Sequence, residues 1–326
     1  MAHEIENNMI AWKTEKPWHG LGVEVAENAT GAEMLKAAGM DWKVEQRTIC
    51  MRGDVAGRVH IIPNFKAIVR NDTKHTFCIP TTKYHIVQNQ EIVDTFREYC
   101  EAGHARMETI GAVRNGAVVW ALAKLNGGSN ATLKGGDEMK GYLLMATSHD
   151  GSMKTIGKAT SVRVVCQNTL TAALSGKKAE FGMKHTSKWT DEKKAEARIA
   201  MGMAMENIQK VHKAAELLSN VNIDHSDWLT FMSKLMGGEE NVIDSQTASL
   251  TRMAQDIQDA TVLSPGAQLE SAKGTLWGAI NGVTYFADHM RGRTQDTRLV
   301  SAWFGDSDLL KRTAVNVALE MAGLTV

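Results

Sequence analysis

Several patterns that usually identify an enzyme are missing from these 326 residues. The four cysteines, Cys50, Cys78, Cys100 and Cys166, are far apart, and no pair has the spacing of metal ligands. The ligand spacings of zinc hydrolases and the Gly-x-Ser-x-Gly nucleophile elbow are also absent. We therefore predict no cofactor, no metal and no catalytic residue, although an enzyme of an unrecognised type stays open. The cysteines are expected to be buried free thiols.

One segment approaches a phosphate-binding loop without completing it. Five residues separate Gly151 from Gly157, whereas the motif requires four, and Ala159 stands where a metal-binding hydroxyl is needed. The segment also reads as a turn that enters a strand, whereas a phosphate loop leads from a strand into a helix. Both departures argue against nucleotide hydrolysis.

The chain has no apolar run long enough to cross a membrane, and no signal peptide or lipidation motif is recognisable. We expect a cytoplasmic protein, made inside a bacterial host cell, with no membrane partner. Lysine plus arginine and aspartate plus glutamate number 37 each, so the formal net charge is zero. Any binding of nucleic acid must therefore depend on a local basic patch.

Residues 155–174 read as a strand that passes directly into a helix. Val162, Val164 and Cys166 share one face at period two. Asn168 has the properties of a helix N-cap, and helical spacing follows it. Arg163 lies on this otherwise apolar strand, so its charge must reach water, a carboxylate or a phosphate. A surface arginine whose stem covers the sheet is an equal alternative.

Three stretches resemble one protein family. Residues 163–170, Arg-Val-Val-Cys-Gln-Asn-Thr-Leu, are similar to the signature of phage- and plasmid-encoded proteins built on domain of unknown function 932. Residues 17–22, Pro-Trp-His-Gly-Leu-Gly, resemble the opening motif of that family, and residues 274–289 resemble its closing motif. The resemblance implies a mobile-element setting, but the family name assigns no function.

The first half is predicted to be α+β. A capping box at Thr30 and Glu33 predicts a short helix, and a second helix is expected over residues 90–102 with Asn89 as its cap. Short strands are expected over residues 42–48, 59–62, 66–70 and 76–79, whereas residues 1–29 read as mostly irregular. Further strands are expected over 106–113, 117–125, 140–147 and 153–166. An Asn-Gly turn, a glycine-rich loop over residues 126–136 and an Asp-Gly turn separate them, which predicts an antiparallel meander flanked by helices.

The second half is predicted to be mostly α-helical. A helix of about 28 residues should begin after Thr190, and shorter helices are expected over residues 227–236, 246–260, 274–291 and 308–322. We place a domain boundary near residue 180. The predicted domains are residues 1–180, which carry the sheet, and residues 181–326, which are helical.

Residues 151–198 hold ten cations and four acids, an excess of six positive charges. A cationic groove along a sheet, with Trp120 or Trp189 beside it, would suit the backbone of a single nucleic-acid strand. A solvated charged face is the alternative, and the same two readings apply to the arginines and acids over residues 288–312. The candidate nucleic-acid-binding residues are Lys158, Arg163, Asn168, Lys177, Lys178, Lys184, Arg291 and Arg293.

Two functions from different classes fit these observations. The first is a DNA-binding protein that binds single-stranded DNA, works as a homo-oligomer and anneals strands in recombination or replication of a phage or plasmid. The predicted meander and helix broadly resemble the core of phage single-strand annealing proteins. The second is a non-catalytic assembly factor whose methionine-rich helical half binds another protein. Binding to phosphates should weaken steeply with salt, whereas an apolar protein interface should not.

Overall fold

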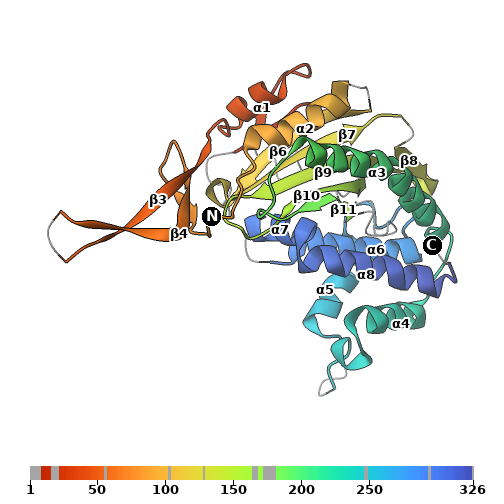
Figure 1. Cartoon of the computed structure of the whole chain (residues 1–326). Coiled ribbons are helices and arrows are strands. Elements are labelled where there is room, and N and C mark those ends of the chain that lie inside the picture. The colour runs from red at the N-terminus through yellow and green to blue at the C-terminus, as the bar shows by residue number, and fades with distance from the viewer. Residues whose placement is uncertain are drawn as a thin grey trace.

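A nine-stranded sheet lies at the centre of the computed structural model, which describes residues 9–15, 22–54, 57–101, 104–127, 129–163, 168–171, 181–245, 249–292 and 295–324. Figure 1 shows helices on both faces of this sheet and a two-stranded arm that projects from one end. The chain is therefore α+β, strand-rich in its first half and helical in its second, as predicted.

The predicted meander is confirmed. Strands β6 (Ala105–Val113), β7 (Val118–Leu125), β9 (Asp137–Ser148) and β10 (Thr155–Arg163) pair antiparallel in that order. The turn between β6 and β7 places Arg114, Asn115 and Gly116 at φ values of 54°, 56° and 90°, which an Asn-Gly pair tolerates well. Between β7 and β9, the glycine-rich loop contains one more strand, β8 (Asn130–Leu133), paired with β9.

The predicted helix at Asn168 is wrong. Residues Asn168–Thr171 form strand β11, which pairs antiparallel with β10 through Arg163↔Asn168 and Thr160↔Thr171. The chain therefore turns back as a hairpin, and Asn168 caps no helix. The edge of β10 offers a row of backbone partners, and the alternating threonines of β11 suit a strand, so pairing overrides the local capping signal.

The remaining strands extend the sheet at both ends. On one side β12 (Phe181–Met183) also pairs with β10. On the other, β1 (Ile10–Trp12) pairs with β6 and β2 (Val23–Glu24) pairs with β1. The irregular reading of residues 1–29 is therefore wrong for β1, a buried three-residue strand that is too short for period-two analysis.

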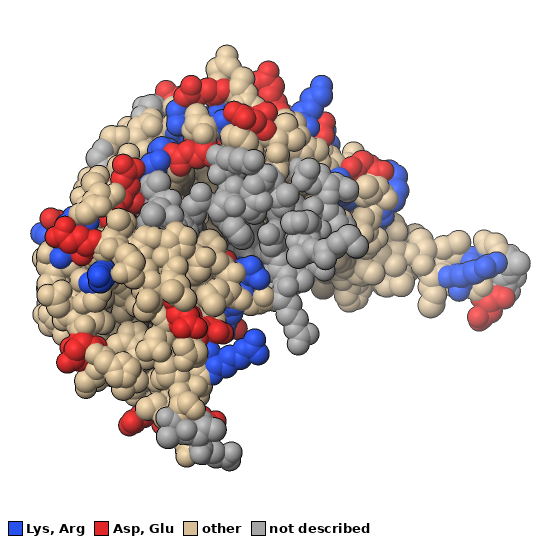
Figure 2. All heavy atoms as spheres, turned by 180° about the vertical axis from the view of Figure 1, so that it is seen from behind, with Lys and Arg blue, Asp and Glu red and all other residues tan. Residues whose placement is uncertain are grey.

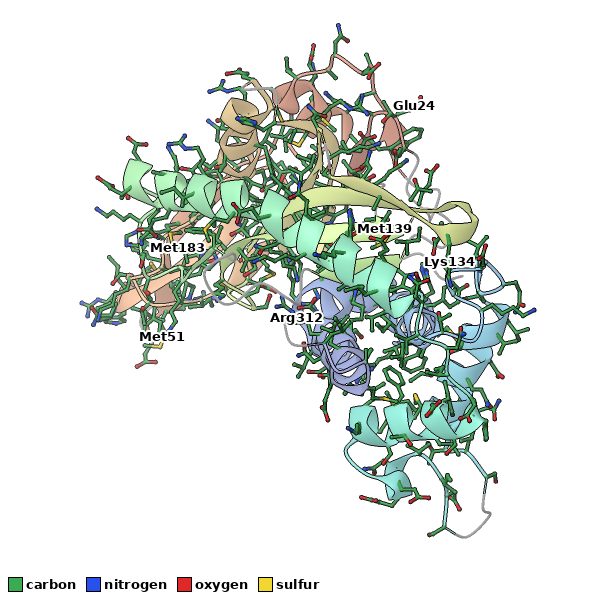
Figure 3. The ribbon with its side chains drawn as sticks, turned by 90° about the vertical axis from the view of Figure 1, so that its right-hand side faces the viewer. Glu24, Met51, Lys134, Met139, Met183 and Arg312 are labelled. Carbon is green, nitrogen blue, oxygen red and sulfur yellow. The ribbon has the colours of Figure 1, made fainter. Side chains whose placement is uncertain are left out.

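Helices α2 (Asn89–Glu101) and α3 (Asp191–Leu218) cover one face of the sheet, and Figure 3 shows α3 crossing it beside Met139 and Met183. The predicted length of 28 residues for α3 is confirmed. So is the capping box that begins α1 (Gly31–Ala37). Asn89 has a different role from the predicted cap, because its amide bonds the Met40 carbonyl and His149 Nε2 instead.

Helices α6 (Leu276–Tyr285), α7 (Gln295–Phe304) and α8 (Asp306–Met321) lie toward the other face of the sheet, in blue in Figure 1. A π-helical turn, Phe286–Met290, continues α6, and α7 has no counterpart in the predicted helices. A small apolar cluster joins the sheet to α7 through Trp120, Leu144 and Trp303. Side chains alternate along β7, so Val119 and Ala121 face the main core while Trp120 faces α7.

Helices α4 (His225–Met236) and α5 (Arg252–Leu263) form a lobe at the far end of the helical half. The main core cluster contains residues from Met9 to Leu319, on both sides of the predicted boundary at 180. That boundary itself falls outside the described residues. Within the described ranges, none of the helices combines the length and apolar character that crossing a bilayer requires.

The arm consists of β3 (Val44–Arg52) and β4 (Val59–Arg70), with β5 (Thr76–Cys78) paired to β4 at its base. The two strands predicted over residues 59–62 and 66–70 are a single strand, which continues through Pro63 and through Asn64 at a φ of 64°. Cys50 is exposed on this arm, so the expectation of a buried thiol is wrong there.

Candidate nucleic-acid interface

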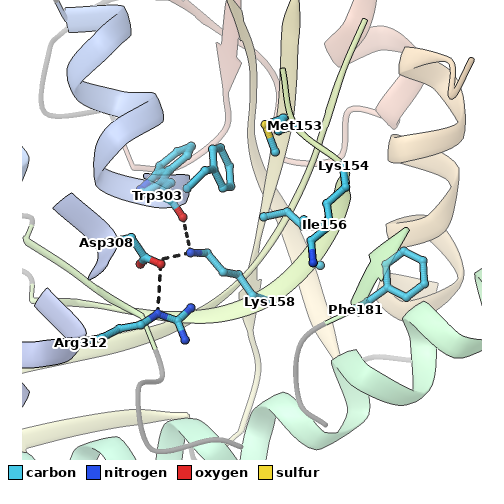
Figure 4. A pocket seen from close by; sticks show the side chains of 10 residues that line it. Met153, Lys154, Ile156, Lys158, Phe181, Trp303, Asp308 and Arg312 are labelled. Atoms are coloured by element: carbon cyan, nitrogen blue, oxygen red, sulfur yellow. Dashed lines mark hydrogen bonds and ion pairs between the residues drawn. The ribbon is translucent and has the colours of Figure 1, made fainter. Parts of the chain in front are cut away.

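A pocket of about 540 Å³ opens between β10 and the helices α7 and α8. Figure 4 shows its two walls: Met153, Lys154, Ile156 and Lys158 come from β10 and the two residues before it, and Trp303, Asp308 and Arg312 come from the helices. Phe181 of β12 and Phe304 of α7 complete the lining. The pocket thus joins three cations and three aromatic rings from segments more than 100 residues apart in the sequence.

Lys158 is buried in this pocket, with 5% of its surface exposed. Its ammonium donates to the Trp303 carbonyl and lies 3.3 Å from Asp308 Oδ1. It also lies 5.5 Å from the centroid of the Phe304 ring. A buried ammonium needs such partners, because an unpaired charge in the interior is costly.

Asp308 is shared between two cations. Its second oxygen, Oδ2, accepts from Arg312 Nε at 3.0 Å, one helical turn along α8. The two cations and one carboxylate leave one net positive charge at the pocket wall. Lys154, which is exposed at the rim, adds another. The wall is therefore electropositive, even though one acid lies within it.

A second pocket of about 660 Å³ adjoins the first, and the two share Met153 and Lys154. Its lining includes the cation Lys184, the acid Asp150 and the hydroxyl side chains Thr81, Ser152 and Thr186. We treat the two adjoining pockets together and call them the groove. Lys158 and Arg312 line the first pocket, Lys184 lines the second, and Lys154 lines both.

Two titratable groups in the second pocket, Cys78 and His185, are uncharged near neutral pH. Burial raises the pKa of the Cys78 thiol to about 11, so the thiol is protonated and a poor nucleophile near neutral pH. Burial also lowers the pKa of His185, whose ring stacks on Tyr84 with 4.7 Å between the centroids. Nδ1 of His185 donates to the His85 carbonyl at 3.1 Å, which fixes the ring of a neutral imidazole.

The structure brings together only part of the predicted site. Lys158 and Lys184 line the two adjoining pockets. Arg163 ends β10, where it pairs with Asn168, and Arg291 follows the π-helical turn. Lys177, Lys178 and Arg293, together with the side chains of Arg163 and Asn168, lie outside the described residues.

Other expectations near the groove need correction. Trp120 is buried against Trp303, and Trp189 packs on Phe181, so neither lines the groove. Lys311 and Asp288, expected on a solvated surface, form a buried ion pair at 2.6 Å. The sequence does not reveal that this ion pair is buried, because its burial results from the packing of α8 against the turn after α6.

The sequence analysis missed the aromatic lining of Phe181, Trp303 and Phe304. Trp303 and Phe304 end a helix that was not predicted, so no sequence signal placed them near β10. In the described part of the chain, no three histidine, cysteine, aspartate or glutamate side chains are grouped as metal ligands would be.

Comparison with known proteins gives one match. The family model described as domain of unknown function (DUF932) matches residues 78–303, from the last residue of β5 to the penultimate residue of α7, and covers most of both pockets. Nothing matches among the curated proteins, and nothing matches among the solved structures.

Proposed function

Since the chain belongs to the DUF932 family, whose description assigns no activity, we propose a function from its groove: the protein binds single-stranded DNA there. One observation carries the proposal. Two adjoining pockets share Lys154, so that four cations, two acids and four aromatic rings, those of Tyr84, Phe181, Trp303 and Phe304, line the groove. Proteins that bind single strands combine these same elements, cations for the phosphates and aromatic rings for the bases.

The shape of the groove favours a single strand over a duplex. Each pocket is within the usual volume range of small-molecule sites and is recessed between the sheet and its neighbours. A base in a duplex is stacked and paired, so it enters a recess only after leaving the helix. An unpaired base can enter the first pocket and contact Trp303, Phe304 or Phe181, while its phosphates contact Lys154 and Arg312.

The biological setting of the proposal comes from the sequence. The three motifs resemble proteins of phages and plasmids, for which single-stranded DNA is an intermediate of recombination and replication. We propose that the protein acts on such intermediates in the cytoplasm of a bacterial host, and that strand annealing follows from binding. The alternative is a non-catalytic assembly factor, which predicts that the groove does not bind DNA.

Fluorescence anisotropy tests the proposal. We expect a labelled single-stranded oligonucleotide to bind more tightly than the matching duplex, with affinity that falls steeply between low and moderate salt. The variant Lys154→Glu/Lys184→Glu should weaken binding by more than tenfold at low salt, because two cations of the groove become anions.

The control is Lys36→Glu/Lys43→Glu, which also reverses two lysine charges, at exposed positions outside the groove. It should bind as the unchanged protein does. Failure to bind any oligonucleotide at low salt would refute the proposal, as would equal losses in the groove variant and the control.

A further inference from the structure

The outer part of the arm is a two-stranded ribbon with an apolar surface. Here residues 50–52 of β3 pair with residues 59–61 of β4, and β5 reaches only Ile68 and Val69 near the base. Val59 is 62% exposed and Ile61 is 68% exposed. An isolated ribbon of two strands is marginally stable in water, and an exposed apolar ribbon is a site for association.

One face of this ribbon carries both apolar residues together with a cation. The register pairs Cys50 with Ile61 and Arg52 with Val59, so these four side chains project from the same side. Over residues 44–70, five cations oppose two acids, a net charge of +3. We call the face of Cys50, Arg52, Val59 and Ile61 the arm face. Figure 2 shows the arm from behind, with charged residues at its tip.

A surface of opposite charge lies at the other end of the molecule. Residues 221–263, which contain α4 and α5, hold seven acids and two cations, a net charge of −5. On α5, Asp259 is exposed and is followed at i+3 and i+4 by Val262 and Leu263, which are 51% and 78% exposed. We call the surface of Asp259, Val262 and Leu263 the α5 face.

We propose that the arm face of one copy binds the α5 face of a second copy of this chain. Val59 and Ile61 would then cover Val262 and Leu263, and Arg52 would meet Asp259. The two faces match in shape of contact and in charge. Each carries two exposed β-branched or leucine side chains beside one charged residue, and the two charges are opposite. A purely apolar partner would not explain why the arm is net positive and the α4–α5 lobe net negative.

The proposed contact joins two different surfaces, so it leaves one of each free on the resulting dimer. The arm and the α4–α5 lobe project from different parts of the molecule in Figure 1. Copies would therefore add head to tail into a ring or a filament. The inference is independent of DNA binding, because no residue of either face lines the groove.

Sedimentation velocity of the full chain, without DNA, tests this inference at a series of concentrations. The unchanged protein should form species larger than its monomer of 35.7 kDa. The arm variant Arg52→Glu/Ile61→Ser and the α5 variant Asp259→Lys/Leu263→Ser should each remain monomeric. Their equimolar mixture should form dimers and nothing larger, because one intact arm face then meets one intact α5 face.

Charge exchange provides a second readout. Combining Arg52→Glu with Asp259→Lys in one chain should restore the large species that either single change weakens. Circular dichroism of each variant verifies that the arm and lobe remain folded. The inference is overturned if the protein is monomeric at every concentration, or if the α5 variant alone still assembles, which would indicate pairing between two arms. It is equally overturned if the arm variant assembles normally and loses only its affinity for DNA.

Discussion

Lys158 Nζ and Asp308 Oδ1 lie 3.3 Å apart and join strand β10 to helix α8 across 150 residues of sequence. Both side chains are largely buried, with 4% and 12% of their surfaces exposed. The ion pair therefore has two consequences. It fixes α8 against the sheet, and it places a negative charge beside the cations of the first pocket.

Replacing Asp308 by Asn should separate these two consequences. Loss of one partner from a buried ion pair costs about 3–5 kcal/mol, and the remaining Trp303 carbonyl should limit the loss here to about 2–3 kcal/mol. Single-stranded DNA should bind roughly threefold more tightly, because an anion leaves the groove. Urea unfolding and anisotropy measure the two effects. Weaker DNA binding by a folded Asp308→Asn protein would contradict the assignment of the groove.

The buried pair of Lys311 and Asp288 should behave as a unit. Lys311 is fully buried, and its ammonium lies 2.6 Å from Asp288 Oδ1. Lys311→Met alone leaves a buried carboxylate without this partner and should cost about 3–5 kcal/mol in the free energy of unfolding. Adding Asp288→Leu should restore part of that loss, which a double-mutant cycle from urea titrations measures. Strict additivity of the two changes would show that the pair is not coupled.

Glu15 should make the free energy of unfolding depend on pH in the acidic range. Although burial opposes ionisation, hydrogen bonds from Lys124, Lys140 and Tyr142 lower the pKa of Glu15 to about 2, from 4.5 in the unfolded chain. The lowered pKa stabilises the fold above about pH 4.5, and this contribution is lost as the pH falls toward 2. Because the carboxylate is 37% exposed, we expect about 1–2 kcal/mol at neutral pH.

Urea titrations of the unchanged protein and of Glu15→Gln at pH 7 and pH 2.5 measure this contribution. The variant should be less stable than the unchanged protein at pH 7. This difference in the free energy of unfolding should shrink at pH 2.5, where Glu15 of the unchanged protein begins to be protonated and to lose its ion pairs with Lys124 and Lys140. An equal difference at the two pH values would contradict the assigned pKa.

Two helical glycines should respond in opposite directions to alanine. A Cβ at Gly278, in α6, would lie 1.8 Å from the Ala272 carbonyl oxygen, so the backbone must shift. Gly278→Ala should therefore destabilise the protein by about 1–3 kcal/mol or more. Gly202, in α3, has open space around it, and Gly202→Ala should stabilise by about 0.5–1 kcal/mol. Thermal unfolding compares the two, and equal shifts in Tm would contradict the packing of α6.

Local signals explain which parts of the fold could be predicted. The Asn115-Gly116 turn, the capping box at Thr30 and the helical period of α3 are short-range patterns, and the structure confirms the elements that they indicate. Asn168 is a counter-example. Its local sequence suits a helix cap, but the free edge of β10 lies beside it in space and pairs with it instead.

The groove was predictable only in part for the same reason. Lys158 and Lys184 belong to a visible excess of basic residues, so composition pointed to them. Trp303, Asp308 and Arg312 reach the same pocket only through the packing of α7 and α8 on the sheet. No residue spacing in the sequence predicts that these side chains lie in one pocket, because their proximity depends on contacts between segments about 150 residues apart.

Photochemical cross-linking tests the location of DNA most directly. A single-stranded oligonucleotide containing 5-bromodeoxyuridine is irradiated with the protein, and the adducts are mapped by mass spectrometry. We predict adducts at the aromatic residues of the first pocket, Phe181, Trp303 or Phe304, and their loss in Lys154→Glu/Lys184→Glu. Adducts confined to the arm or to the α4–α5 lobe, with none in the pocket, would contradict the assignment of the groove as the DNA-binding site.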